Sequence, residues 1–148
     1  MNDAQVVDVN GVRNVVARYV HFADDGDGSG VASLFVSDGT MNSLGVTVRG
    51  REALGALIER IAPACLKHIT ANSAVEVAGN AATATTDVLL LAPGPGRGSA
   101  EGWQIMGCGR YDDELVKQDG VWLFQRRTIN WHRSTTESTL AAVVEMLS

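Results

Sequence analysis

The sequence has little of several features that mark specialised classes of protein. It contains only two cysteines, Cys65 and Cys108, which are too few for the disulfide framework of a small secreted domain. Both lie among apolar residues, so we expect them to be reduced and to be small residues of the core. The chain also has no run of about 18 apolar residues, the length that a membrane-spanning helix needs.

Positive charge is scarce as well. The 12 Lys and Arg residues are outnumbered by 17 Asp and Glu residues, which gives a formal net charge of −5. Nucleic acid and anionic membranes both need a basic surface, so neither is expected as a partner. The first residues, Met1 to Ala4, lack the basic start and apolar core of a signal peptide. We therefore expect a cytoplasmic protein.

The composition is that of an ordinary globular protein. Apolar residues make up 45% of the 148 residues and charged residues 20%, which is enough apolar material for one substantial core. We find no repeat and no linker, and therefore expect a single domain over residues 1–148.

Apolar residues at three- and four-residue spacing predict helices in the first half of the chain. The first runs from about Val6 to Ala23 and ends in a turn-forming run at 24–30. The other predicted elements of this half are a short helix at 29–35, a turn at 37–39, short strands at 40–44 and 47–49, and a helix at 50–61 that Pro63 ends. A further short helix is expected at 136–147.

Alternating patterns predict four longer strands after the third helix. They span about 67–77, 82–91, 103–116 and 121–132. Tight turns at 78–80 and 117–120 join two pairs of them into hairpins. Helices followed by a run of antiparallel strands predict an α+β fold, with the helices packed on one face of a curved sheet. Such a sheet closes into a cone with an interior.

The strand at 67–77 carries the most informative pattern. His68, Thr70 and Asn72 share one face, whereas the opposite face has Ile69, Ala71, Ser73, Val75 and Val77. The polar face suits either the wall of a polar cavity or a surface strand in water. The expected cone favours the cavity.

Three stretches resemble the SnoaL-like branch of the nuclear-transport-factor-2-like superfamily. They are 19–27 with its continuation through 32–35 and 38–39, then 50–54, and finally 119–127. The resemblance spans roughly residues 6–132. It implies a cone-shaped α+β barrel, a curved and mostly antiparallel sheet wrapped on N-terminal helices. This scaffold hosts both enzymes and non-enzymes.

A narrower resemblance points to the group of scytalone dehydratase, bile-acid 7α-dehydratase and hexachlorocyclohexane dehydrochlorinase. These proteins keep an Asp near the end of the first helix and a His at the start of the strand after the third helix, which match Asp24 and His68. A polar residue five before the Asp and an Arg five after a hairpin Trp match Tyr19 and Arg127. The second active-site His of scytalone dehydratase has no match here.

This resemblance implies a cofactor-independent lyase or isomerase that acts on a small, largely apolar cyclic molecule. His68 would be the general base, and Asp24 would fix its tautomer and stabilise the imidazolium. Tyr19 would donate a hydrogen bond to the substrate, and Arg127 would stabilise negative charge. No metal or organic cofactor is required. Sheet faces are commonly buried between subunits in this family, so the apolar face of the strand at 67–77 predicts a homodimer or homotrimer.

Further residues are expected to line the interior. Arg126 and Arg127 have opposite strand parity, so one should point inward and the other outward. The resemblance implies that Arg127 is the inward one. The candidate substrate-binding residues are Thr70, Asn72, Leu90, Gly109 and Tyr111.

Several alternatives stay open from the residues alone. Asp24 suits a cap on the turn after the first helix, and Tyr19 suits a core aromatic. The chain also suits a non-catalytic small-ligand-binding or dimerisation module, or a polyketide-cyclase-like activity that uses another acid such as Asp87. A calcium loop beginning at Asp25 is rejected, because its twelfth position is Val36 instead of the required Glu.

Overall fold

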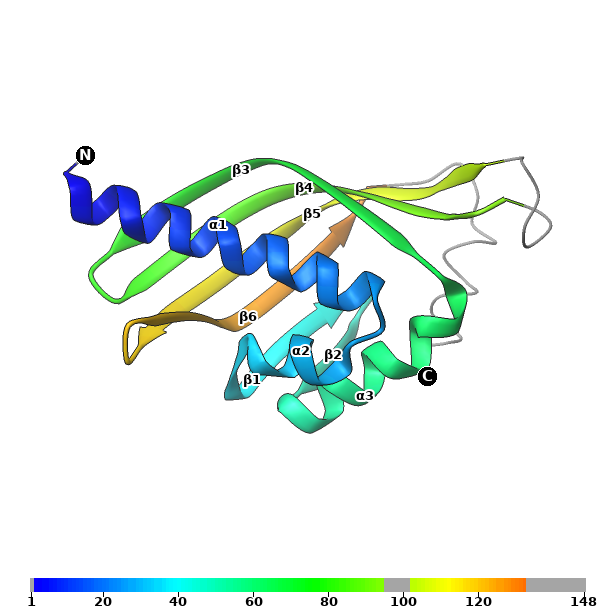
Figure 1. Cartoon of the computed structure of the whole chain (residues 1–148), viewed down its shortest axis with the longest axis horizontal. Coiled ribbons are helices and arrows are strands. Elements are labelled where there is room, and N and C mark those ends of the chain that lie inside the picture. The colour runs from blue at the N-terminus through cyan, green and yellow to red at the C-terminus, as the bar shows by residue number, and fades with distance from the viewer. Residues whose placement is uncertain (1, 95–101, 133–148) are drawn as a thin grey trace.

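A curved sheet with a long helix lying across it forms most of the protein (Figure 1). The computed structural model describes residues 2–94 and 102–132. Within those residues the sheet has six strands in the order β2-β1-β6-β5-β4-β3. Neighbouring strands are antiparallel except β1 and β6, which are parallel. The predicted α+β class, with N-terminal helices on a mostly antiparallel sheet, is confirmed.

The four long strands lie where the sequence pattern predicted them. These four strands are β3 Lys67–Ala78, β4 Ala81–Pro93, β5 Trp103–Gln118 and β6 Val121–Trp131, and the two earlier strands are β1 Phe35–Ser43 and β2 Val46–Arg49. The turn between β5 and β6 holds Asp119 and Gly120 at φ values of 49° and 81°. Two successive residues with positive φ make the tight turn that suits the twist of a hairpin, which explains the Asp-Gly pair.

The helices are α1 Asp3–Asp24, α2 Gly28–Ser33 and α3 Arg51–Ile61, followed by a 3₁₀ turn, η1 Ala62–Ala64. Helix α1 begins earlier than predicted, because Asn2 and Gln5 form a capping box in which each side chain accepts from the other's backbone N–H. Its buried residues follow the three- and four-residue spacing that predicted the helix, and they are Val12, Val15, Val16, Tyr19, Val20 and Ala23.

The region between α2 and α3 differs from the prediction. Strand β1 already starts at Phe35 and includes residues 37–39, which were predicted to be a turn. The pairing of β1 with β6 shifts register between Phe35 and Thr40, so the irregular segment is accommodated inside the strand. The helix predicted at 136–147 lies outside the described residues.

Both cysteines are exposed, so the expectation that they belong to the core is wrong. Cys65 follows the 3₁₀ turn with a left-handed backbone, φ 51°. Cys108 lies on the outer face of β5, between the inward-facing positions Gly107 and Gly109. Strand parity therefore decides its exposure.

Aromatic rings fill the space between α1 and the sheet. Tyr19 packs edge-on against Phe35, Tyr111 and Phe124, with ring centroids 6.1–6.4 Å apart. All four side chains are buried. Among the described helices, none combines the length and apolarity needed to cross a bilayer.

Candidate active site

Asp24 and His68 meet at one end of the sheet, although 44 positions separate them in the sequence. The Oδ1 atom of Asp24 lies 2.7 Å from Nδ1 of the His68 ring. The same oxygen accepts a hydrogen bond of 3.0 Å from the His68 backbone N–H. The two side chains are only 5% and 11% exposed, so the pair is shielded from solvent.

Local structure explains why the two residues meet. Asp24 is the last residue of α1, and His68 is the second residue of β3, which begins just after the left-handed Cys65. A carboxylate at the C-terminal end of a helix is disfavoured by the helix dipole, so Asp24 needs donors from elsewhere. Its contacts come from β3 and not from its own turn. The structure therefore does not show Asp24 as a cap on the turn after α1.

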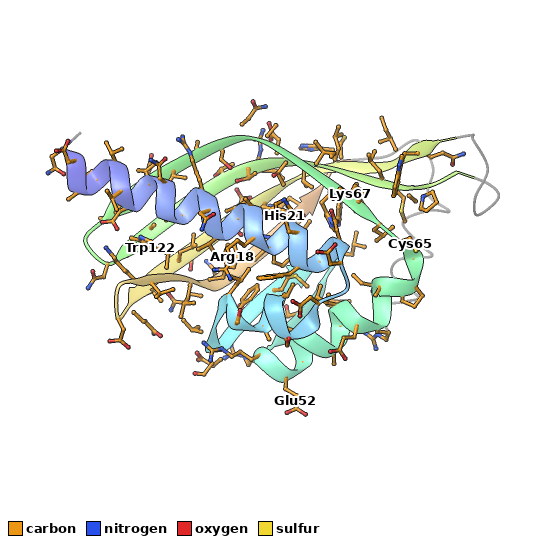
Figure 2. The ribbon with its side chains drawn as sticks, in the orientation of Figure 1. Arg18, His21, Glu52, Cys65, Lys67 and Trp122 are labelled. Atoms are coloured by element: carbon orange, nitrogen blue, oxygen red, sulfur yellow. The ribbon has the colours of Figure 1, made fainter. Side chains whose placement is uncertain are left out.

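Lys67 provides the remaining contact of the carboxylate. Its Nζ lies 2.6 Å from Oδ2 of Asp24, and its side chain is 43% exposed. Figure 2 shows Lys67 beside the C-terminal end of α1. Two adjacent residues of β3 thus contact both oxygens of one buried carboxylate. His68 donates hydrogen bonds to Oδ1, whereas Lys67 makes an ion pair with Oδ2, which has no hydrogen-bond partner of good geometry among the described residues.

These contacts decide the ionisation of Asp24. Burial alone raises the pKa of the Asp24 carboxyl, but the hydrogen bond from His68 and the ion pair with Lys67 outweigh burial, and the pKa lies below its ordinary value of 3.8. A lowered pKa means that Asp24 stabilises the fold above pH 3.8. That contribution is lost as the pH falls through the pKa of the folded state.

The other ring nitrogen of His68 is the one available for chemistry. In a neutral ring that donates from Nδ1 to Asp24, Nε2 carries the lone pair. Nε2 has no hydrogen-bond partner among residues 2–94 and 102–132. Leu90 is the cross-strand neighbour of His68 on β4, so one wall beside the ring is apolar.

A bulge in β3 joins His68 to the core-facing side of the strand. The pairing with β4 shifts register between Ala71 and Ala74, and Asn72 within this bulge has φ 53°. The extra residue reverses the alternation, so His68 and Thr70 share the inner face with Ser73, Val75 and Val77. The prediction that alternate residues keep to the same face along the whole strand is therefore wrong beyond residue 71.

Asn72 is corrected by the same bulge. It was predicted to line the interior, but its exposed side chain donates a 2.9 Å hydrogen bond to Asp87 on the outer face. Val75 and Val77, expected on an exposed apolar face, pack against the core. Ile69 remains exposed, as predicted.

The left-handed backbone at Asn72 gives a stability prediction. Asn tolerates this conformation better than most residues, whereas a β-branched side chain does not. We expect Asn72→Val to lower the free energy of unfolding by about 1–3 kcal/mol relative to Asn72→Gly. Both variants lose the contact with Asp87, so urea denaturation of the pair isolates the backbone effect. Equal stabilities would contradict the prediction.

Arg127 points inward and Arg126 outward, as expected. The Arg127 side chain is fully buried, and its Nε and Nη2 each donate a 2.7 Å hydrogen bond to Asp113 on β5. Its guanidinium carbon lies 4.1–4.3 Å from the ring centroids of Tyr19, Tyr111 and Phe124. Burial lowers the pKa of Arg127, but Asp113 more than compensates and raises it, so the group is always charged.

Two polar atoms near this ion pair lack partners. Nη1 of Arg127 and the hydroxyl of Tyr111 are buried without a hydrogen-bond partner in the part of the chain that the structure describes. Tyr19 donates to Sδ of Met41 at 3.2 Å, and a thioether is a weak acceptor. Burial raises the pKa of both Tyr19 and Tyr111, so both phenols are neutral donors. Buried donors without partners are few in folded proteins, and a catalytic role is one of the explanations for them.

The other predicted lining residues have different surroundings. Thr70 and Leu90 lie on the inner face near His68. Gly109 is buried, but a side chain there would meet the carbonyl of Asn130 at 2.6 Å and the ring of Trp131 at 3.0 Å. Gly109 therefore serves close packing against β6, and the expectation that it lines a substrate cavity is wrong.

Asp87 faces away from the site. It forms an ion pair of 2.7 Å with Arg110 on the outer face of the sheet. An acid on the outer face cannot take part in chemistry inside the cone. A polyketide-cyclase-like activity that uses Asp87 as its acid is therefore not supported.

Sequence reasoning missed Lys67 and Asp113. Lys67 directly precedes the candidate base, yet strand parity alone would point it away from His68. Asp113 shares parity with Tyr111, so a charged residue at that position signalled a buried ion pair. Among the described residues, no group of three His, Cys, Asp or Glu side chains is arranged to hold a metal ion.

The comparisons with known proteins agree with this helix-covered, curved sheet. The family model of the SnoaL-like domain matches residues 4–128, and the chain belongs to this family. No curated protein matches it significantly. The membership confirms the resemblance drawn from the sequence.

Solved structures agree with this assignment. An Asp-to-Asn variant of a protein of unknown function from Mycobacterium tuberculosis is 30% identical, with a TM-score of 0.86 over 98% of this chain and 89% of that one. A candidate scytalone dehydratase from Novosphingobium aromaticivorans is 24% identical, with a TM-score of 0.77 over 90% and 89% of the two chains. ActVI-ORFA from Streptomyces coelicolor is 22% identical, with a TM-score of 0.72 over 82% and 95%. The latter two likenesses show the fold alone.

Proposed function

We propose that this protein is a cofactor-independent lyase or isomerase that acts on a small, largely apolar cyclic molecule, with His68 as its general base. The observation that carries the proposal is the 2.7 Å contact between Asp24 and His68 Nδ1 in a shielded site, which leaves Nε2 without a partner in the described structure. A base oriented in this way needs only a substrate proton within reach.

The proposed reaction begins when Nε2 removes a proton from a carbon next to a carbonyl or a leaving group. In an elimination, the electrons of the broken C–H bond form a C=C bond, and the leaving group departs with its own bonding pair. In a dehydration, the proton held on His68 passes to the departing hydroxyl, which leaves as water. In an isomerisation, the same proton returns at another carbon. Asp24 stabilises the intermediate imidazolium in each case.

Other inner residues suit the substrate's oxygen and ring. The Tyr19 hydroxyl, now on a weak thioether acceptor, would donate to a carbonyl or leaving hydroxyl. Arg127 and Tyr111 would stabilise negative charge that develops on that oxygen. Leu90 and Thr70 would form the wall beside the base.

The proposal is tested by a substrate screen. Ring-bearing alcohols and ketones are first ranked by the shift they cause in melting temperature. Those that bind are then incubated with the protein in D₂O without added cofactor. We expect product formation, or deuterium exchange at the acidic carbon. Tight binding with neither product nor exchange across the screen would overturn the proposal in favour of a non-catalytic ligand-binding module of the same fold.

We also propose that the chain forms a homodimer or homotrimer. The large apolar side chains Ile69, Leu89, Trp103 and Ile105 are 39–69% exposed on β3, β4 and β5. Such residues favour burial between copies. Sedimentation equilibrium is expected to give two or three times the chain mass of 15.7 kDa, and Ile105→Asp is expected to shift it toward the monomer. A wild-type monomer at micromolar concentration would contradict the expectation.

A further inference from the structure

We propose that Lys67 is a positioning residue of the Asp24–His68 pair: it holds the second oxygen of the carboxylate and limits the positive charge that His68 accepts. This inference rests on the proposed function of His68 as the base. Its starting point is geometric. Lys67 Nζ is 2.6 Å from Oδ2, and His68 Nδ1 is 2.7 Å from Oδ1, of one carboxylate that is 5% exposed.

The ion pair fixes the plane of the carboxylate. Oδ1 already accepts from the ring and from the backbone N–H of His68. A carboxylate held by one oxygen alone is able to rotate about that contact, whereas a cation on Oδ2 removes this freedom. The ion pair therefore restrains the orientation of Asp24, and with it that of the imidazole bonded to Oδ1.

The ammonium also acts on the charge of the base. Asp24 favours the imidazolium form of His68, because opposite charges attract. Lys67 opposes it, because a second positive charge sits on the other side of the same carboxylate. Removal of Lys67 leaves Asp24 unopposed and makes His68 easier to protonate.

The other charged groups nearby do not produce this effect. Asp24 is the main cause of the rise in the pKa of Lys67, and Asp25, the residue that follows α1, contributes to it. Tyr19 and Tyr111 are neutral, and Arg127 is paired with Asp113 in the interior. On β4, the neighbour of His68 is the uncharged Leu90. These groups are common to every Lys67 variant, so a difference between variants reports Lys67.

The test is an NMR titration of the His68 ring, which needs no substrate. Histidine Cε1–H signals are followed from pH 4 to 9 in the wild type and in Lys67→Met, and His68→Gln identifies the signal. We expect the titration midpoint of His68 in Lys67→Met to rise by about half a pH unit to one pH unit. Lys67→Arg, which retains the charge, is expected to keep the wild-type midpoint. An unchanged or lowered midpoint in Lys67→Met overturns the proposal.

Lys117 supplies the matched control. It forms an ion pair of the same length, 2.6 Å, with Asp8 at the other end of α1. Lys117→Met loses a comparable ion pair without touching the site, so the His68 midpoint should not move. An equal shift in both lysine variants would mean a general charge effect and would also overturn the proposal. Lys67→Gln repeats the measurement if the methionine variant does not give a wild-type amide spectrum.

Activity adds a second reading once a substrate is found. The acid limb of the pH profile of kcat/KM should move upward by the same amount as the midpoint. Failure of the proposed function is recognised separately, because His68→Gln would then keep full turnover while the titration still reports on Lys67. A midpoint that moves without any change in the pH profile would overturn the catalytic part of the inference.

Discussion

Replacement of His68 by glutamine is expected to lower turnover about 10²- to 10⁴-fold with little change in substrate affinity. Glutamine is similar in size and is able to donate a hydrogen bond to Asp24, but it cannot accept a proton at neutral pH. The loss should therefore appear in kcat and not in KM. Steady-state kinetics on a compound from the screen measures both constants.

His21 provides the matched control for this experiment. It is an exposed histidine on α1 and lies three residues before Asp24 (Figure 2). His21→Gln makes the same chemical change near the same helix end, and we expect wild-type turnover from it. If a folded His68→Gln protein, verified by circular dichroism, kept wild-type turnover, His68 would not be the base.

The second large effect is expected at Asp113. Asp113→Asn leaves the fully buried Arg127 without a carboxylate partner, and such a loss typically costs about 3–5 kcal/mol of unfolding free energy. Burial makes this ion pair different from the surface pairs of the protein, which contribute little. Urea denaturation of the variant and the wild type gives the difference directly.

Two further variants separate charge from other effects. Asp112→Asn changes the adjacent, exposed residue, and we expect it to alter the unfolding free energy by no more than about 1 kcal/mol. The double variant Asp113→Leu with Arg127→Met removes both charges, and it should be more stable than Asp113→Asn alone. A cost at Asp113 no greater than at Asp112 would show that Arg127 needs no partner.

Much of the fold was readable from the sequence because its signals are local. The alternation of the four long strands, the Asp-Gly turn at 119–120 and the stripe of Val residues on α1 each reflect contacts within a few residues. The start of β1 was not readable. Residues 37–39 have turn-forming chemistry, and they lie inside a strand only because Phe35 and Thr40 on either side of them pair with β6.

The site was readable in part, for the same reason. Family resemblance placed Asp24 beside His68, and the structure brings them together. The contact of Lys67 with Asp24 depends on how β3 leaves the turn at Cys65, which no periodic pattern records. Asn72 and Gly109 were predicted to line the interior of the cone from their positions in strands with alternating patterns. The bulge and the close approach of Trp131 overrode both assignments.

The bulge at Asn72 also bears on how relatives of this protein should be compared. The side of the sheet that His68 faces depends on the number of residues between it and Val75, because each added or lost residue turns the histidine over. A relative one residue shorter in this interval would carry the same His-Ile-Thr sequence and yet present the ring to solvent. The spacing from the histidine to the first core valine is therefore a better guide to an intact Asp–His contact than the presence of the histidine itself.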